Sequence, residues 1–120
     1  MISVLITSGS RYPFARRLIR EKIKKFLSTV GLDDVEVSLA IVGIRKVQAL
    51  NRQYRQINKA GLVLSFPLDE TRGPDGILRL GDVVICYPEA RQKAAQEKKM
   101  VDEVIWELVE HGLKNLIKLT

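Results

Sequence analysis

The residues best suited to metal chemistry are His111 and Asn115, near the end of the chain. His111 is the only histidine among the 120 residues. On a helix, residues four apart lie one above the other, so these two side chains share a face. Val104 and Leu108 fall on the same face, which predicts that it is turned inward. A histidine four residues from a second ligand on an inward helical face is typical of zinc enzymes.

An ordinary structural role for His111 is the main alternative. A single histidine on an inward helical face is more often a partly buried side chain than a ligand, bonded to a carbonyl or to Asn115. The amide oxygen of Asn115 is neutral, and it suits harder ions such as calcium or magnesium better than zinc. Cys86, the one cysteine, lies in the apolar run "VVICY". We interpret it as a small buried hydrophobe rather than as a ligand or nucleophile.

The elements that must position these residues follow from periodicity and from turn signals. The spacing of apolar residues predicts helices over 13–30, 44–57, 88–99 and from 101 onward. Runs rich in apolar and β-branched residues predict strands over 1–7, 35–43, 62–68 and 78–87. We therefore expect one α/β domain covering residues 1–120, with a sheet of about four strands packed against helices.

The charge balance favours a polyanionic partner. Lys and Arg number 20 against 14 Asp and Glu, which gives a net charge of +6, and nucleic acid is the first candidate. Aromatic residues make up only 6% of the chain, so contacts to phosphates are expected more than base stacking. No secretion signal or apolar run of membrane-spanning length is present, so we expect a cytoplasmic protein with no membrane partner.

Basic residues form regular rows on two predicted helices. Arg16, Arg20 and Lys24 are spaced by four on the first helix, and Arg45 and Arg52 lie on the outer face of the second. Such rows are either solvated helix surfaces or stripes that contact RNA phosphates, and the sequence leaves both readings open.

Five short stretches together point to a known family. They are "LNRQYR" (50–55), "VLSFPLDE" (63–70), "LGDVVI" (80–85), "ARQKA" (90–94) and "ELVEHGL" (107–113). In this order and spacing the chain resembles the YbeY family of rRNA maturation factors, which are small metal-dependent endoribonucleases. The resemblance implies a zincin-like fold, in which a mixed sheet packs against helices and a cleft separates the sheet from the last helix.

The resemblance also assigns roles to particular residues. It implies zinc held by three histidines, of which His111 is the first. The second position is Asn115, and the third would fall beyond Thr120. Arg55 matches the arginine that is thought to contact RNA or to stabilise charge in the cleft. Residues 60–62 read Ala-Gly-Leu, where the family usually has Pro-Thr-Asp or Pro-Thr-Asn.

The activity implied by the resemblance is metal-assisted hydrolysis of single-stranded RNA, on or at the small ribosomal subunit. Because two of the three ligand positions lack histidine, we expect no tightly bound zinc and an impaired or lost reaction. One alternative is a non-catalytic RNA- or ribosome-binding module that has kept the fold and the basic surface. Another is a protein-interaction domain whose charge serves only solubility.

Overall fold

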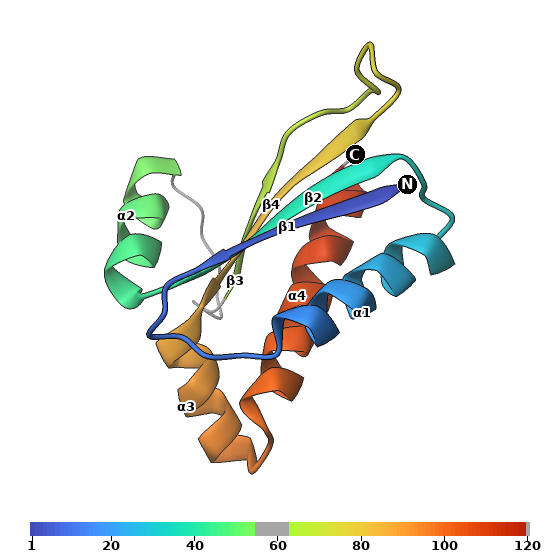
Figure 1. Cartoon of the computed structure of the whole chain (residues 1–120). Coiled ribbons are helices and arrows are strands. Elements are labelled where there is room, and N and C mark those ends of the chain that lie inside the picture. Colours follow the sequence, from blue (N-terminus) through green and yellow to red (C-terminus); the bar gives the residue numbers. More distant parts are fainter. Residues whose placement is uncertain (55–62, 120) are drawn as a thin grey trace.

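The computed structural model describes residues 1–54 and 63–119, in which strands alternate with helices (Figure 1). The strands are β1 (Ile2–Ser8), β2 (Val35–Val42), β3 (Val63–Pro67) and β4 (Leu78–Cys86). The helices are α1 (Arg16–Thr29), α2 (Ile44–Tyr54), α3 (Tyr87–Glu97) and α4 (Val101–Leu119). The strands form one mixed sheet in the order β1-β2-β4-β3, in which only β3 is antiparallel to its neighbour. The predicted α/β architecture with a sheet of four strands is confirmed.

The main core lies between the sheet and the pair of helices α1 and α4, which Figure 1 shows on the same side of the strands. β2 explains how the sequence builds this layer, because buried and half-buried residues alternate along its whole length. Its odd-numbered residues, from Val35 to Ile41, point into the main core. Strict alternation is what a strand with two different faces requires.

The opposite face of the sheet is covered by α2 alone among the described helices, through a smaller apolar cluster. Val47 of α2 packs there with Leu64, Val84 and Cys86 from the two strands β3 and β4. Cys86 is buried, and burial raises the pKa of its thiol. Both observations agree with the interpretation of this cysteine as a small hydrophobe rather than a nucleophile.

A bulge in β4 marks the one irregularity in the pairing of β2 with β4. Glu36 pairs with Arg79 and Val37 with Gly81, so Leu80 is an extra residue in β4. Gly81 has φ 138, a value that favours glycine, and its Cα faces the backbone of Phe66 and Pro67. The glycine of the "LGDVVI" motif is therefore required by backbone geometry and by the close approach of β3.

Helix α1 begins at Arg16, three residues later than predicted, because Pro13 and Phe14 belong to the preceding loop. The backbone N–H of Ala15, which has no partner within the helix, donates a hydrogen bond of 3.0 Å to a carboxylate oxygen of Asp102, at the start of α4. The predicted end of α1 is confirmed, since Gly31 follows the helix with φ 85. The predicted extension of α2 to residue 57 lies outside the described residues. No helix in the described ranges is long and apolar enough to cross a membrane.

Candidate functional site

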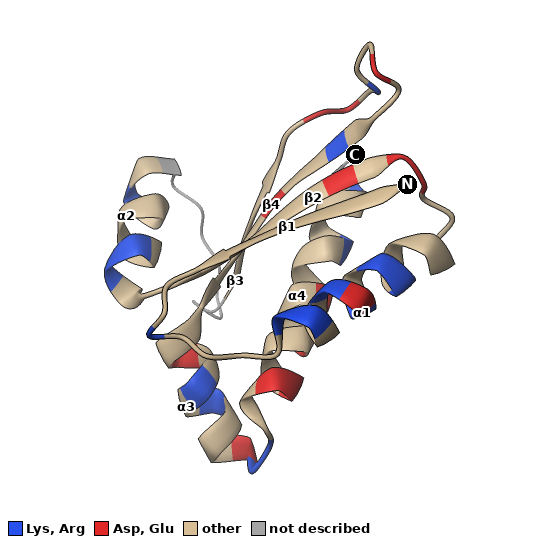
Figure 2. Cartoon of the chain, in the orientation of Figure 1, with Lys and Arg blue, Asp and Glu red and all other residues tan. Residues whose placement is uncertain are grey.

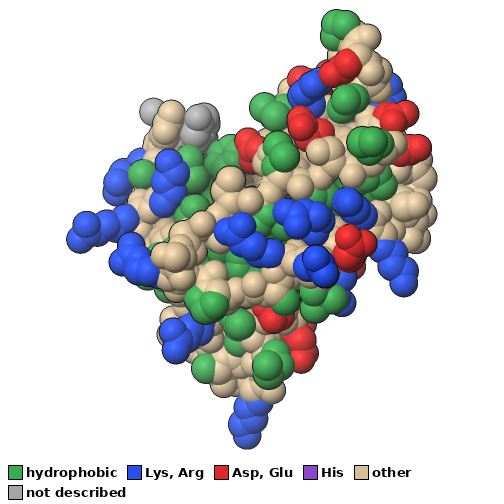
Figure 3. All heavy atoms as spheres, viewed as in Figure 1, with side chains coloured by type: hydrophobic (Ala, Val, Ile, Leu, Met, Phe, Trp, Pro, Cys, Tyr) green, Lys and Arg blue, Asp and Glu red, His purple; other side chains and the backbone are tan. Residues whose placement is uncertain are grey.

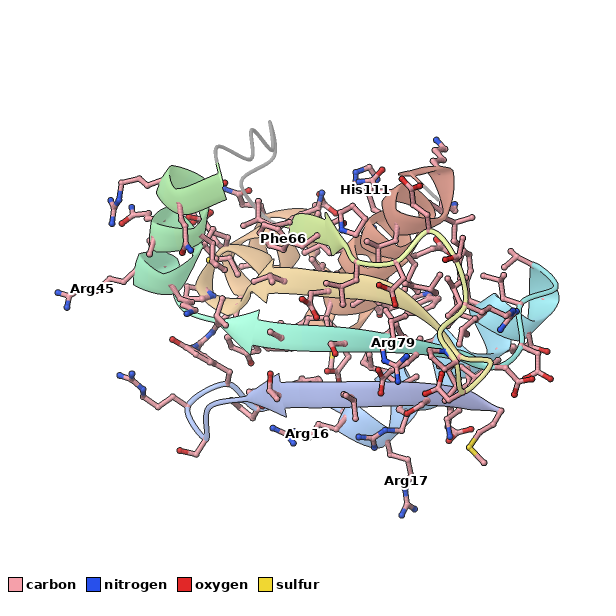
Figure 4. The ribbon with its side chains drawn as sticks, turned by 90° about the horizontal axis from the view of Figure 1, so that it is seen from above. Arg16, Arg17, Arg45, Phe66, Arg79 and His111 are labelled. Carbon is pink, nitrogen blue, oxygen red and sulfur yellow. The ribbon has the colours of Figure 1, made fainter. Side chains whose placement is uncertain are left out.

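His111 does not lie on the inward face of α4, so this prediction is wrong. Its side chain is exposed, and Asn115 is half-buried. Figure 4 shows His111 on the β3 side of the sheet, pointing outward from α4. The buried face of α4 is centred on Ile105, Val109, Gly112 and Leu116. His111 directly precedes Gly112, and one residue corresponds to about 100° of rotation around a helix.

Gly112 brings α4 into direct contact with the sheet beside His111. A Cβ at this position would lie 2.7 Å from a methyl carbon of Val83 and 3.2 Å from one of Val63. The hydroxyl of Ser65 donates a hydrogen bond of 3.1 Å to the carbonyl oxygen of Gly112. At this level the helix and the strands are closely packed, and Ser65 serves to join them.

The donor set around His111 does not fit zinc held by three protein ligands. In the described part of the chain, no group of three or more His, Cys, Asp or Glu side chains could hold a metal ion. Asp82 pairs with Phe66 on the face of the sheet opposite α4, so it is turned away from His111. The segment 55–62 contains no residue of these four types either. What remains is one imidazole and one neutral amide, whereas catalytic zinc takes three nitrogen, sulfur or carboxylate ligands.

Arg55, the arginine matched by the family motif, lies outside the described residues, as do residues 60–62. The described structure therefore places His111 and Asn115 but does not place Arg55 relative to them. The segment that contains Arg55 joins the end of α2 to the start of β3. Its role stays a prediction.

The predicted basic residues lie in two separate areas (Figure 2). Figure 3 shows one band of Lys and Arg side chains over α1 and a second group over α2. Part of the hydrogen-bonding capacity of Arg16 is used within the protein. Its guanidinium donates hydrogen bonds to the backbone and hydroxyl oxygens of Ser8 and lies 5.8 Å from the centre of the Phe14 ring. Arg17 and Arg45 are exposed, while Arg20 and Lys24 are half-buried. Long basic side chains keep their charged ends toward solvent, where a polyanion can reach them.

Sequence reasoning missed an apolar groove between α2 and the sheet. It has a volume of about 710 Å³, and its lining includes Leu5, Ala40, Leu50, Phe66 and Asp82. One sequence signal was the second set of alternating residues in β2, of which Glu36, Ser38 and Ala40 are small or polar. The groove lies on the opposite side of the sheet from α4.

Comparisons with known proteins agree on one family. A model of the family described as Endoribonuclease YbeY matches residues 10–117. The curated Endoribonuclease YbeY of Anaeromyxobacter sp. (strain Fw109-5) is 39% identical over 103 residues, which are 86% of this chain and 53% of that protein. The Endoribonuclease YbeY of Acinetobacter baumannii (strain AB307-0294) is 37% identical over 124 residues, covering 97% of this chain and 78% of that protein.

A solved structure agrees with the fold. The solution structure of TM1509 from Thermotoga maritima has a TM-score of 0.61 and 24% sequence identity, over 97% of this chain and 71% of that one. The mixed sheet packed against helices, which the motifs implied, is thereby confirmed. The chain spans about half the length of the two Anaeromyxobacter relatives that it matches, 53% and 52%.

Proposed function

The chain belongs to the endoribonuclease YbeY family, and from this premise we propose that it binds single-stranded RNA and acts in rRNA maturation. Its site of action is the small ribosomal subunit in the cytoplasm. The net charge of +6 and the two basic areas over α1 and α2 support this proposal. RNA phosphates are the ligand that such surfaces suit, because each neutralised phosphate releases counterions.

The pairing of His111 with Asn115 supports the second part of the proposal, that metal-dependent cleavage is impaired or lost. Zinc, the metal implied by the family resemblance, would supply a hydroxide nucleophile by lowering the pKa of bound water. His111 is well exposed for such a role, but Asn115 offers only a neutral amide oxygen. The residues of this chain therefore serve to bind and orient RNA, and no hydrolytic step is assigned to them.

The test of binding is the salt dependence of affinity for a labelled single-stranded RNA. We expect the logarithm of the association constant to fall linearly with the logarithm of salt concentration, with a slope of about −0.7 for each phosphate contacted. Fluorescence anisotropy at several salt concentrations measures this slope. Affinity that does not change with salt, or no binding, would contradict the proposal and favour a protein-interaction domain whose charge serves solubility.

The test of catalysis compares this chain with the Acinetobacter baumannii relative as a positive control. Both proteins are purified without added metal, analysed for zinc and assayed for cleavage of single-stranded RNA with and without a chelator. We expect this chain to carry much less than one zinc and to show no cleavage that the chelator abolishes. One zinc per chain together with chelator-sensitive cleavage would overturn the proposed impairment.

Arg55→Ala is expected to weaken RNA affinity more than Arg45→Ala. We propose that Arg55, which matches the arginine of the family motif, contacts RNA, where loss of charge-assisted hydrogen bonds to phosphate costs about 1.5–3 kcal/mol. Arg45 is exposed on the outer face of α2, where one charge contributes only a general attraction. The two variants are compared with the wild-type protein in the same anisotropy assay. Equal losses would mean that Arg55 is not part of the RNA site.

A further inference from the structure

We propose that a pocket outside the carboxyl ends of β1 and β4 binds one nucleotide of a single-stranded RNA. This inference rests on the proposed RNA-binding function and adds a site that neither the metal-ligand positions nor the basic rows include. The pocket, called here the tyrosine pocket, has a volume of about 370 Å³ and is lined by residues 11–12 and by α3 residues that include Tyr87, Pro88, Arg91 and Gln92. That volume is at the lower end of the range for small-ligand sites.

The topology of the sheet explains why a pocket forms here. β1, β2 and β4 are parallel, so their carboxyl ends meet at one edge of the sheet. Tyr12 follows β1, Gly43 follows β2, and Tyr87 follows β4 as the first residue of α3. In open α/β sheets, ligands bind in the crevice outside these strand ends.

Two tyrosines form a fixed apolar wall of the pocket. The rings of Tyr12 and Tyr87 lie with their centroids 5.1 Å apart and their planes at 35°. The hydroxyl of Tyr87 donates a hydrogen bond of 2.7 Å to the carbonyl oxygen of Pro13. The hydroxyl of Tyr12 lies so close to Gly43 that a Cβ there would be 2.5 Å away. Tyr87 is buried, with 6% of its surface exposed, so the half-buried Tyr12 ring is the part of the wall that can receive a planar base. Because both rings are held by their surroundings, it can do so without reorganising.

Two arginines supply charge for a phosphate at the rim of the pocket. Arg11 and Arg91 are both exposed, and neither makes an ion pair with another residue in the described ranges. Guanidinium groups bind phosphate through two parallel hydrogen bonds. The amide of Gln92 adds a neutral donor and acceptor for a base edge or a ribose. Together the wall and the rim match the two chemistries of one nucleotide, an apolar base and an anionic phosphate.

The charge part of the proposal is tested with the double variant Arg11→Ala/Arg91→Ala. The probe is a labelled single-stranded oligouridylate, and the readout is the salt slope of its affinity. Losing the charge that binds this one phosphate should reduce the magnitude of the slope by about 0.7 and weaken binding about tenfold or more. The control is Lys118→Ala, which removes one exposed charge from the last turn of α4, outside both the pocket and the two basic areas. It should change the slope by less than the double variant does.

The base part is tested with Gly43→Ala, which leaves every charge in place. The added methyl group must displace the Tyr12 hydroxyl, so we expect affinity to fall about tenfold with an unchanged salt slope. Thermal unfolding of the same variant shows whether the fold is kept. A double arginine variant with the wild-type slope, or Gly43→Ala with wild-type affinity, would overturn the tyrosine pocket alone. No RNA binding by the wild-type protein would overturn the proposed function as well.

Discussion

Gly81→Ala is expected to lower the free energy of unfolding by about 2–6 kcal/mol. The φ of 138 is strained for any residue with a side chain, and such backbone strain costs about 1–3 kcal/mol. The new methyl group would also collide with the carbonyl oxygen of Phe66 and lie 2.9 Å from the Cα of Pro67. Forcing a methyl group into a filled site costs a further 1–3 kcal/mol or so. Urea unfolding followed by circular dichroism measures the change.

Gly76→Ala is the matched control, because it separates strain from the close approach of the two strands. Gly76 also has a positive φ, 79, but a Cβ there would meet nothing within 4 Å. We expect this variant to lose only the strain contribution, about 1–3 kcal/mol. If Gly81→Ala is no less stable than Gly76→Ala, then β3 does not approach β4 as closely as described.

Asn115→His is expected to raise the affinity of the chain for zinc. The new imidazole would lie one helical turn after His111 and on the same face of α4. His111 is exposed and Asn115 is half-buried, so both positions are accessible to a metal ion. A residue that only orients a metal ligand contributes about 10–100-fold to metal affinity. A residue that binds the metal directly, such as the new histidine, should raise the zinc affinity by at least about that factor. Competition with a chromophoric zinc chelator measures the affinity.

Glu110→His controls for the simple addition of a histidine to the same helix. Glu110 directly precedes His111, so its side chain is rotated by about 100° and cannot share a metal ion with the same geometry. Its only salt bridge within the described residues, to Lys114, is long at 3.9 Å, so the substitution should not disturb the fold. Equal zinc affinity in the two variants would mean that His111 does not hold the position of a ligand.

The sheet and its main core could be predicted from sequence because they depend on local patterns. The first half of the run Val35–Val42 alternates in the sequence as it alternates in burial, and glycine or proline bounds several of the elements. The start of α1 could not be placed in the same way. It depends on the contact of Ala15 with Asp102, which lies 87 residues away in the chain.

The position of His111 shows where periodicity alone is insufficient. Val104 and His111 are seven residues apart, which places them within about 20° of each other around the helix axis. Val104 is completely buried and His111 is exposed, so angle alone does not decide burial. The deciding factor is which residues touch the sheet, and that contact is centred on Gly112. The tyrosine pocket could not be predicted from periodicity either, because Tyr12, Gly43 and Tyr87 come from three separate parts of the chain.

The strand order β1-β2-β4-β3 has a consequence for the route of folding. β1 with β2, and β3 with β4, are each joined through a single connection, whereas β2 and β4 pair across a longer separation, as in Val35 with Leu78. Closing a longer loop costs more conformational entropy, and this cost precedes the stabilising contacts between the strands. We therefore expect β3 and β4 to pair before β2 and β4 do, since Pro67 pairs with Gly81 across a much shorter loop. Pulsed hydrogen exchange would refute this order if the amides between β2 and β4 were protected before those between β3 and β4.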